Sequence, residues 1–105
     1  MITRVPEALR ESLRLLSTDP QYGSLQAMHE RLVGQFLDER PFKARGFSWM
    51  QPAKRGTLGW SDNYNVVVSD ELQKRVKKEA VRIDVSLTTL LYTALSWWNE
   101  RQRPT

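Results

Sequence analysis

Asparagine occurs at alternate positions near the middle of the chain, at Asn63 and Asn65, and valine follows at Val67. Successive side chains of an extended strand point to opposite faces, so these three residues would share one face of a strand. A carboxamide can pair with the edge of adenine through one donor and one acceptor, and valine can contact the methyl group of thymine. The spacing therefore indicates a strand face able to contact base edges. The alternative is that the asparagines only form an edge or a turn.

Positive charge is concentrated in one segment of the chain. Five basic residues and no acidic residue lie from Arg40 to Trp60, whereas the rest of the chain has 11 basic and 12 acidic residues, a balance of −1. A basic segment that also carries aromatic side chains favours a polyanionic partner. A solvated linker with basic residues for solubility is the alternative. The other basic residues of the segment are Lys43, Arg45, Lys54 and Arg55, and its aromatic residues are Phe42, Phe47, Trp49 and Trp60.

No set of residues suggests catalysis. The only histidine, His29, lies on the apolar face of a predicted helix, where a core residue is expected rather than a ligand or a base. The sequence contains no nucleophile–base pair, no metal-ligand cluster and no glycine-rich phosphate loop. The absence of cysteine excludes disulfide bonds and thiol catalysis. We therefore expect no enzyme and no cofactor.

The composition also limits the location of the protein. A chain without cysteine fits a reducing cytoplasm. No apolar run approaches the roughly 20 residues that span a bilayer. The first residues, "MITRVPEALRE", lack the apolar core of a secretion signal. We therefore expect a cytoplasmic protein that does not enter the membrane.

Two strands and four helices are predicted to position these residues. The strands cover Met1–Val5 and Asn63–Val68, and since an isolated strand leaves its backbone groups unpaired, we expect them to pair antiparallel. Val68 should point inward, with Tyr64 and Val66 on the same face. Apolar residues recur at helical spacing, with a serine cap at the start of the last three helices, in residues 6–17, 24–39, 69–81 and 86–100.

The order strand, helix, helix occurs twice. The apolar positions that follow Ser24 and Ser86 have the same spacing, with Leu25 and Leu87 as the first inward positions. The interpretation is one domain, 1–105, in which the copies 1–40 and 62–105 flank a basic aromatic linker over 41–61. Chance similarity among four helices is the alternative. The predicted fold class is mainly α, with a two-stranded antiparallel ribbon over the stacked apolar faces of the helices.

The stretch "VVVSDELQKRVKKEAVRIDVSLTTLLYTAL" resembles the ribbon-helix-helix family of DNA-binding proteins. It has the short strand, a helix that starts with Ser-acid-acid-Leu, and a second helix that opens with Ser-Leu after a tight turn. The resemblance covers residues 63–102 well and residues 1–40 more loosely. With "YGSLQAMHERL" in the first half, the chain resembles the VirC-type accessory proteins of T-DNA transfer, which hold both copies in one chain. The resemblance implies a single-chain, pseudo-twofold ribbon-helix-helix fold (β-α-α-linker-β-α-α).

A two-stranded ribbon of this kind fits the major groove of double-stranded DNA. Besides the residues of the second strand, Arg4 should face outward and suits guanine, unless the first strand slips by one residue and places Thr3 outside instead. The resemblance further implies that the starts of the second helices hold DNA phosphates, although plain N-capping also explains the two serines. The expected base contacts are Arg4 or Thr3, Asn63, Asn65 and Val67, and the expected phosphate contacts are Ser24, Leu25, Ser86, Leu87, Lys43, Arg45, Lys54 and Arg55.

The resemblance implies an accessory factor of plasmid or T-DNA conjugative transfer, or of plasmid maintenance. A transcriptional repressor remains an alternative. So does a protein-interaction module that has lost DNA affinity and binds a transfer or partition protein through the aromatic linker and the outward Trp97. Because the linker of 21 residues holds the copies together, we expect a monomer in solution, with side-by-side assembly on DNA as an option.

Overall fold

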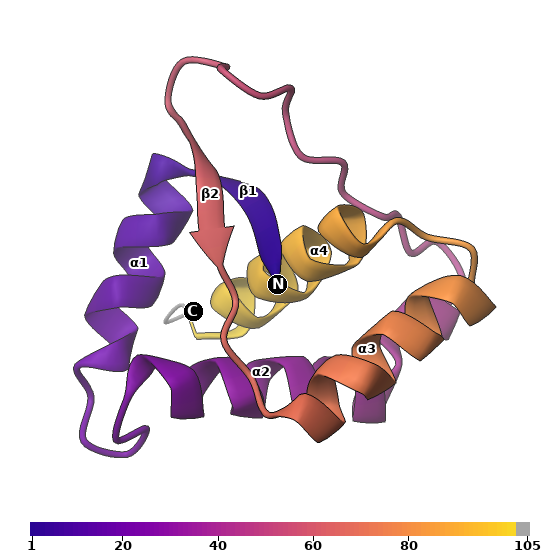
Figure 1. Ribbon diagram of the computed structural model, residues 1–105, viewed down its shortest axis with the longest axis horizontal. Helices are drawn as coiled ribbons and strands as arrows, with labels where there is room; N and C mark the ends of the chain where they lie inside the picture. Colours follow the sequence, from indigo (N-terminus) through magenta and orange to yellow (C-terminus); the bar gives the residue numbers. More distant parts are fainter. Residues whose placement is uncertain (103–105) are drawn as a thin grey trace.

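The computed structural model, which describes residues 1–102, has four helices and one two-stranded antiparallel sheet (Figure 1). This result confirms the predicted fold class at the level of helices and sheet. Within those residues, no helix has the length and apolar character needed to cross a membrane. The elements in chain order are β1 (Ile2–Pro6), α1 (Glu7–Ser17), α2 (Leu25–Glu39), a short 3-10 turn (Pro41–Lys43), β2 (Trp60–Asn65), α3 (Asp70–Arg82) and α4 (Leu87–Arg101).

The serine caps predicted for three helices are confirmed. Each serine side chain accepts a hydrogen bond from the backbone N–H three residues later, which satisfies one of the otherwise unpaired donors of the first turn. Such a cap contributes about 1 kcal/mol to stability. The donors are Ala27 for Ser24, Leu72 for Ser69 and Thr89 for Ser86.

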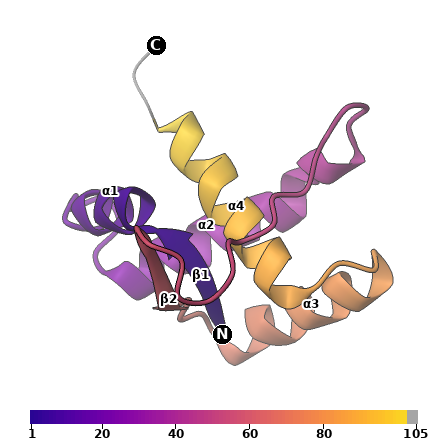
Figure 2. The ribbon, with the colours of Figure 1, turned by 90° about the horizontal axis from the view of Figure 1, so that it is seen from above.

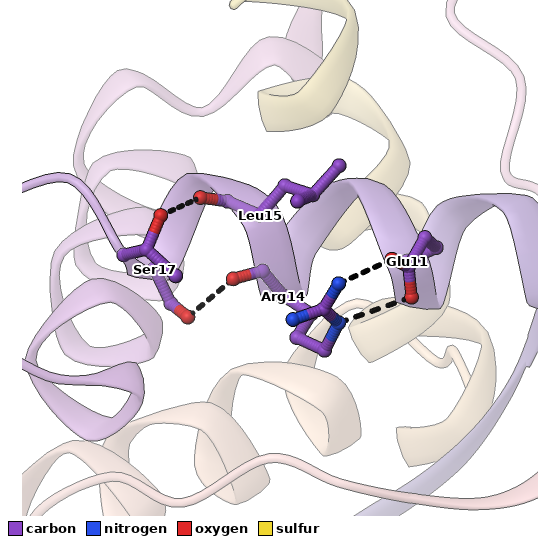
Figure 3. Close-up of polar contacts among 5 residues, drawn as sticks. Glu11, Arg14, Leu15 and Ser17 are labelled. Atoms are coloured by element: carbon purple, nitrogen blue, oxygen red, sulfur yellow. Dashed lines mark hydrogen bonds and ion pairs between the residues drawn. The ribbon is translucent and has the colours of Figure 1, made fainter.

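The end of α1 is stabilised by local contacts (Figure 3). Arg14 lies one turn after Glu11 and forms an exposed ion pair with it. The hydroxyl of Ser17 donates to the carbonyl of Arg14 (2.7 Å), and that of Thr18 donates to the carbonyl of Leu15 (2.6 Å). The carbonyl of Leu15 also accepts the N–H of Thr18 (3.2 Å), so the two hydroxyl bonds supplement the backbone bonds of the last turn of α1.

Helix α4 lies at the centre of the molecule. Its sequence, "LTTLLYTALSWW", is apolar around most of its circumference, which is typical of a helix enclosed by other elements. It packs against α1, α2, α3 and β1, and Figure 2 shows it crossing α2. The predicted inward face is confirmed, except that Leu87 is only partly buried; Leu90, Leu91, Ala94, Leu95 and Trp98 are buried.

Leu25, the first predicted inward residue of α2, is an error of the sequence analysis. Its side chain is exposed, because it occupies the first turn of α2, before the helix reaches the core at Met28. The remainder of the predicted face is buried, from Met28 to Phe36.

The two strands pair antiparallel, as predicted, but the bounds of the second strand differ. It covers Trp60–Asn65 instead of Asn63–Val68. The second strand starts earlier because the first strand continues to Pro6, which pairs with Trp60. At its end, the N–H of Val67 turns to the His29 side chain instead of to β1. A bulge places Asp62 and Asn63 opposite Arg4, since Thr3 pairs with Tyr64 and Val5 with Ser61.

The linker between the halves packs on the helices instead of forming a free tether. The ring of Trp49 lies 6.0 Å from that of Phe36 in α2, and it contacts the rings of Phe42 and Phe47. Farther along, the N–H of Met50 donates to the hydroxyl of Thr93 in α4 (2.9 Å). Aromatic pairs of this kind contribute roughly 0.5–1.5 kcal/mol each beyond their buried area. The aromatic residues of the linker therefore pack against the core.

Candidate nucleic-acid interface

The second strand presents the predicted outward face. Asn63, Asn65 and Val67 are exposed, whereas the intervening Tyr64 and Val66 are buried. The alternation continues beyond β2, because Val66 still donates its N–H to the carbonyl of Met1 (2.7 Å). The three residues therefore share one exposed face. Their predicted contact with bases stays a prediction.

The first strand resolves the alternative between Arg4 and Thr3. Thr3 is completely buried, and its hydroxyl donates to the carbonyl of Thr88 in α4 (2.8 Å), so the slipped strand with Thr3 outside is wrong. Arg4 lies on the opposite face and is partly exposed. Its Nε donates to the carbonyl of Ala53 (2.8 Å), which uses one of the five N–H donors of the guanidinium. The linker therefore orients Arg4.

His29 links helix α2 to the ribbon. Its side chain is completely buried, with Nε2 2.7 Å from the hydroxyl oxygen of Tyr64, and its Nδ1 accepts the N–H of Val67 (3.3 Å). Burial, with a smaller contribution from the ammonium of Met1, lowers the pKa of His29 to about 4. Burial raises the pKa of Tyr64 to about 12. Both groups are therefore neutral near pH 7. The sequence placed His29 in the core but gave no signal of these two bonds.

Of the two predicted phosphate-binding helix starts, that of α4 lies close to the ribbon. The bond from Thr3 to Thr88 places the first turn of α4 directly against β1. At the turn from α3 into α4, a hollow of about 460 Å³ is lined by Lys77, Ser86 and Leu87 among others. In α2, Ser24 lies five residues before His29, roughly 8 Å along the helix axis. The start of α4 therefore lies against the ribbon, whereas the start of α2 lies more than one helical turn before His29, the residue of α2 that bonds to the ribbon.

Glu30 is a further residue that the sequence analysis missed. Its carboxylate accepts hydrogen bonds from both the N–H and the hydroxyl of Ser69 (2.7 Å each). These two bonds attach the segment that connects the ribbon with α3 to helix α2. No sequence signal indicates the contact, because the two residues are 39 positions apart.

The basic residues of the linker divide into two groups. Lys54 and Arg55 directly follow Ala53, the partner of Arg4, and lie in an exposed turn beside the ribbon. Lys43 and Arg45 follow the C-terminal end of α2, which is roughly 15 Å along that helix from His29. The structure therefore brings Lys54 and Arg55, but not Lys43 and Arg45, next to the predicted base-contacting face.

Arg40, the first positive residue of the basic segment, is paired with an acid. Its Nη2 lies 3.0 Å from a carboxylate oxygen of Glu79 in α3. A hydrogen bond from Arg82, together with the charges of Arg40 and Arg75, lowers the pKa of Glu79. The charge of Arg40 is therefore balanced within the fold.

Trp97, expected to face outward, is partly buried and packs against the core, while Trp98 is buried within it. The ring of Trp97 contacts Phe36 (5.5 Å between centroids), and the guanidinium of Arg101 lies 4.6 Å above it. Beside it, a mainly apolar groove of about 430 Å³ runs between α1, the linker and α4, with Leu9, Phe47 and Met50 among its lining residues.

Comparison of the chain with protein-family models, with curated proteins and with solved structures finds no match. Among residues 1–102, no three histidine, aspartate or glutamate side chains come together in a way that could hold a metal ion.

Proposed function

We propose that this chain is a single-chain ribbon-helix-helix protein that binds double-stranded DNA, with the exposed face of its ribbon in the major groove. The observation that carries the proposal is the alternation along β2 and the two residues that follow it. Asn63, Asn65 and Val67 are exposed while their neighbours are held in the core, so the outward side chains have a fixed direction. A row of carboxamides on one face beside Arg4 suits the donors and acceptors of base edges.

The contacts between the halves support a pseudo-twofold arrangement. Each strand forms its buried side-chain bond with the second helix of the other half: Thr3 of β1 with α4, and Tyr64 of β2 with His29 of α2. Likewise, α1 packs against α4, and α3 packs against α2. Halves that exchange contacts in this way act as the two subunits of a dimer joined in one chain, and we propose the copies 1–40 and 62–105 as those subunits.

Phosphate binding is proposed at the helix starts and the nearby linker turn. The N–H groups and the dipole of a helix start attract anions. Ser24 with Leu25 and Ser86 with Leu87 lie on elements that contact the ribbon, and Lys54 and Arg55 add positive charge beside Arg4. Lys43 and Arg45 are proposed only as outer contacts.

The biological role is proposed from the resemblance in sequence. An accessory factor of plasmid or T-DNA transfer, or of plasmid maintenance, is the leading role, with a transcriptional repressor second. In each of these roles the chain acts by binding and needs no cofactor.

Binding measurements with matched variants test the proposal. A preferred duplex is selected from random DNA, and affinity for it and for random duplex is measured at several salt concentrations. Asn65→Ala should cost roughly 1–3 kcal/mol on the preferred duplex and little on random DNA. Gln102→Ala removes another exposed carboxamide, at the opposite end of α4 from the ribbon, and should change neither. Lys54→Ala should weaken both alike and lower the salt slope by about 0.9.

A site preference that Asn65→Ala leaves unchanged would contradict reading by the ribbon. If the chain binds no duplex DNA at low salt, the second candidate is a protein-interaction module. The specific observation that favours it is the apolar groove beside Trp97 and Phe47. Trp97→Ala should abolish the binding of a transfer or partition protein in this groove, and Asn65→Ala should leave that binding unchanged.

A further inference from the structure

The segment Asn65–Val67 is exposed on the proposed reading face but lies at the end of the sheet. Asn65 is the last residue of β2, paired with Ile2. The next residues do not form part of the sheet. Met1 accepts the N–H of Val66, and its ammonium donates to the carbonyl of Val66 (3.2 Å) and to the side-chain oxygen of Asn65 (3.5 Å), whereas the N–H of Val67 needs another acceptor. The direction of the Asn65 and Val67 side chains therefore depends on what holds this short segment.

That acceptor is the imidazole of His29, which holds the segment from both sides of Asn65. Before Asn65, the hydroxyl of Tyr64 lies 2.7 Å from Nε2; after it, the N–H of Val67 donates to Nδ1 (3.3 Å). Because Nδ1 accepts a hydrogen bond, the neutral ring carries its proton on Nε2 and donates it to Tyr64. One buried side chain thus fixes a backbone donor and a neighbouring side chain at once.

We propose that His29 is a positioning residue for DNA recognition: it holds Asn65 and Val67 in the orientation in which they contact base edges. This inference rests on the proposed function and assigns a role to a residue that cannot touch DNA itself, since it is completely buried. A bidentate contact between a carboxamide and adenine requires both bonds to align. A segment that can rotate satisfies one bond or neither, and the distinction between right and wrong bases falls.

Two substitutions separate the bonds of His29. In His29→Asn, the side-chain oxygen lies about where Nδ1 lies and can accept the N–H of Val67, while the partner of Tyr64 is lost. In His29→Gln, the longer amide reaches toward Tyr64, while Val67 loses its acceptor. Val33→Ala serves as the stability control, because Val33 is also buried in α2 but has no part in these bonds.

The readout is discrimination, the affinity for the preferred duplex divided by the affinity for random duplex, measured well below the melting temperature of every variant. His29→Gln should lower discrimination about tenfold, with affinity for random DNA changed less than about twofold. His29→Asn, which keeps the acceptor for Val67, should lose less discrimination than His29→Gln, and Val33→Ala should retain wild-type discrimination even where it lowers the melting temperature. In parallel, the amide of Val67 should exchange with solvent faster in His29→Gln than in His29→Asn.

The failures of the two proposals are distinguishable. A wild-type chain without any preference among duplexes overturns the proposed function and with it the role of His29. A wild-type chain with a preference that His29→Gln keeps in full overturns only the role of His29. Equal losses of discrimination in His29→Gln and Val33→Ala also overturn it, because stability alone then explains the effect.

Discussion

Acidification should destabilise the fold through one buried side chain, His29. Its pKa is about 4 in the folded state, against 6.5 for a free imidazole. Between these two pH values the unfolded chain therefore binds a proton that the folded chain does not bind. A lowered pKa means that the stability is fully present above pH 6.5 and is lost as the pH falls toward 4. At 1.36 kcal/mol per pKa unit, the whole loss is about 3 kcal/mol, roughly half of it by pH 5.5.

Urea unfolding followed by tryptophan fluorescence gives the free energy of unfolding at each pH between 7.5 and about 4.5. Glu11 and Glu79, whose pKa values are lowered from 4.5 by their arginine partners, lose stabilisation only below about pH 4.5. The change in the free energy of unfolding between pH 7 and 5 therefore reports mainly the protonation of His29. In His29→Leu the titrating group is absent, so the free energy should be nearly constant over that interval, although lower at neutral pH because Tyr64 and Val67 lose their partner.

Two results would refute this reasoning. The wild-type free energy could change by less than about 0.5 kcal/mol between pH 7 and 5, which would show that the folded chain accepts the proton readily. Alternatively, His29→Leu could lose stability as steeply as the wild type, which would assign the effect to other groups.

Three further outcomes are expected. The two halves lie in one chain, so the melting temperature should stay constant over a roughly hundredfold range of protein concentration; a strong rise would indicate an obligate oligomer. Thr3→Val should lower the free energy of unfolding by about 1 kcal/mol because Thr88 loses a buried donor, whereas Thr3→Ser should lose less, as urea titration would show. Selection from random duplexes should yield an asymmetric site, because the two strands present different outward residues; a perfect inverted repeat bound by one chain would contradict the assignment of Arg4 and Asn65.

The parts of this fold that the sequence predicted are those set by local patterns. Ser24, Ser69 and Ser86 start helices because a serine side chain competes for the first N–H groups of its own chain, which needs no distant partner. The inward direction of Tyr64 and Val66 follows in the same way from the period of a strand. The antiparallel pairing of the two strands could be predicted because each lacked any other partner.

The parts that the sequence did not predict depend on distant contacts. The strand β2 begins at Trp60 because Pro6 extends β1, and neither apolar spacing nor turn residues mark that position. The contribution of the linker to the core depends on how Trp49 contacts Phe36, 13 positions earlier. The bonds of His29 to Tyr64 and Val67 join residues more than 30 positions apart. In composition and spacing, His29 is one more member of a helical face.

The distance in sequence between the paired strands has a consequence for synthesis of the chain on the ribosome. When α2 is complete at Glu39, the partners of its buried face in β2 and α4 do not yet exist. At 5–20 residues per second, about 1–5 s pass before Asn65 is made, and a further 2–7 s before α4 ends at Arg101. During that time Met28, Leu32 and Phe36 remain open to water and to other nascent chains. The first half should therefore depend on chaperones or on slow collapse until α4 arrives, and truncation after α3 should favour aggregation.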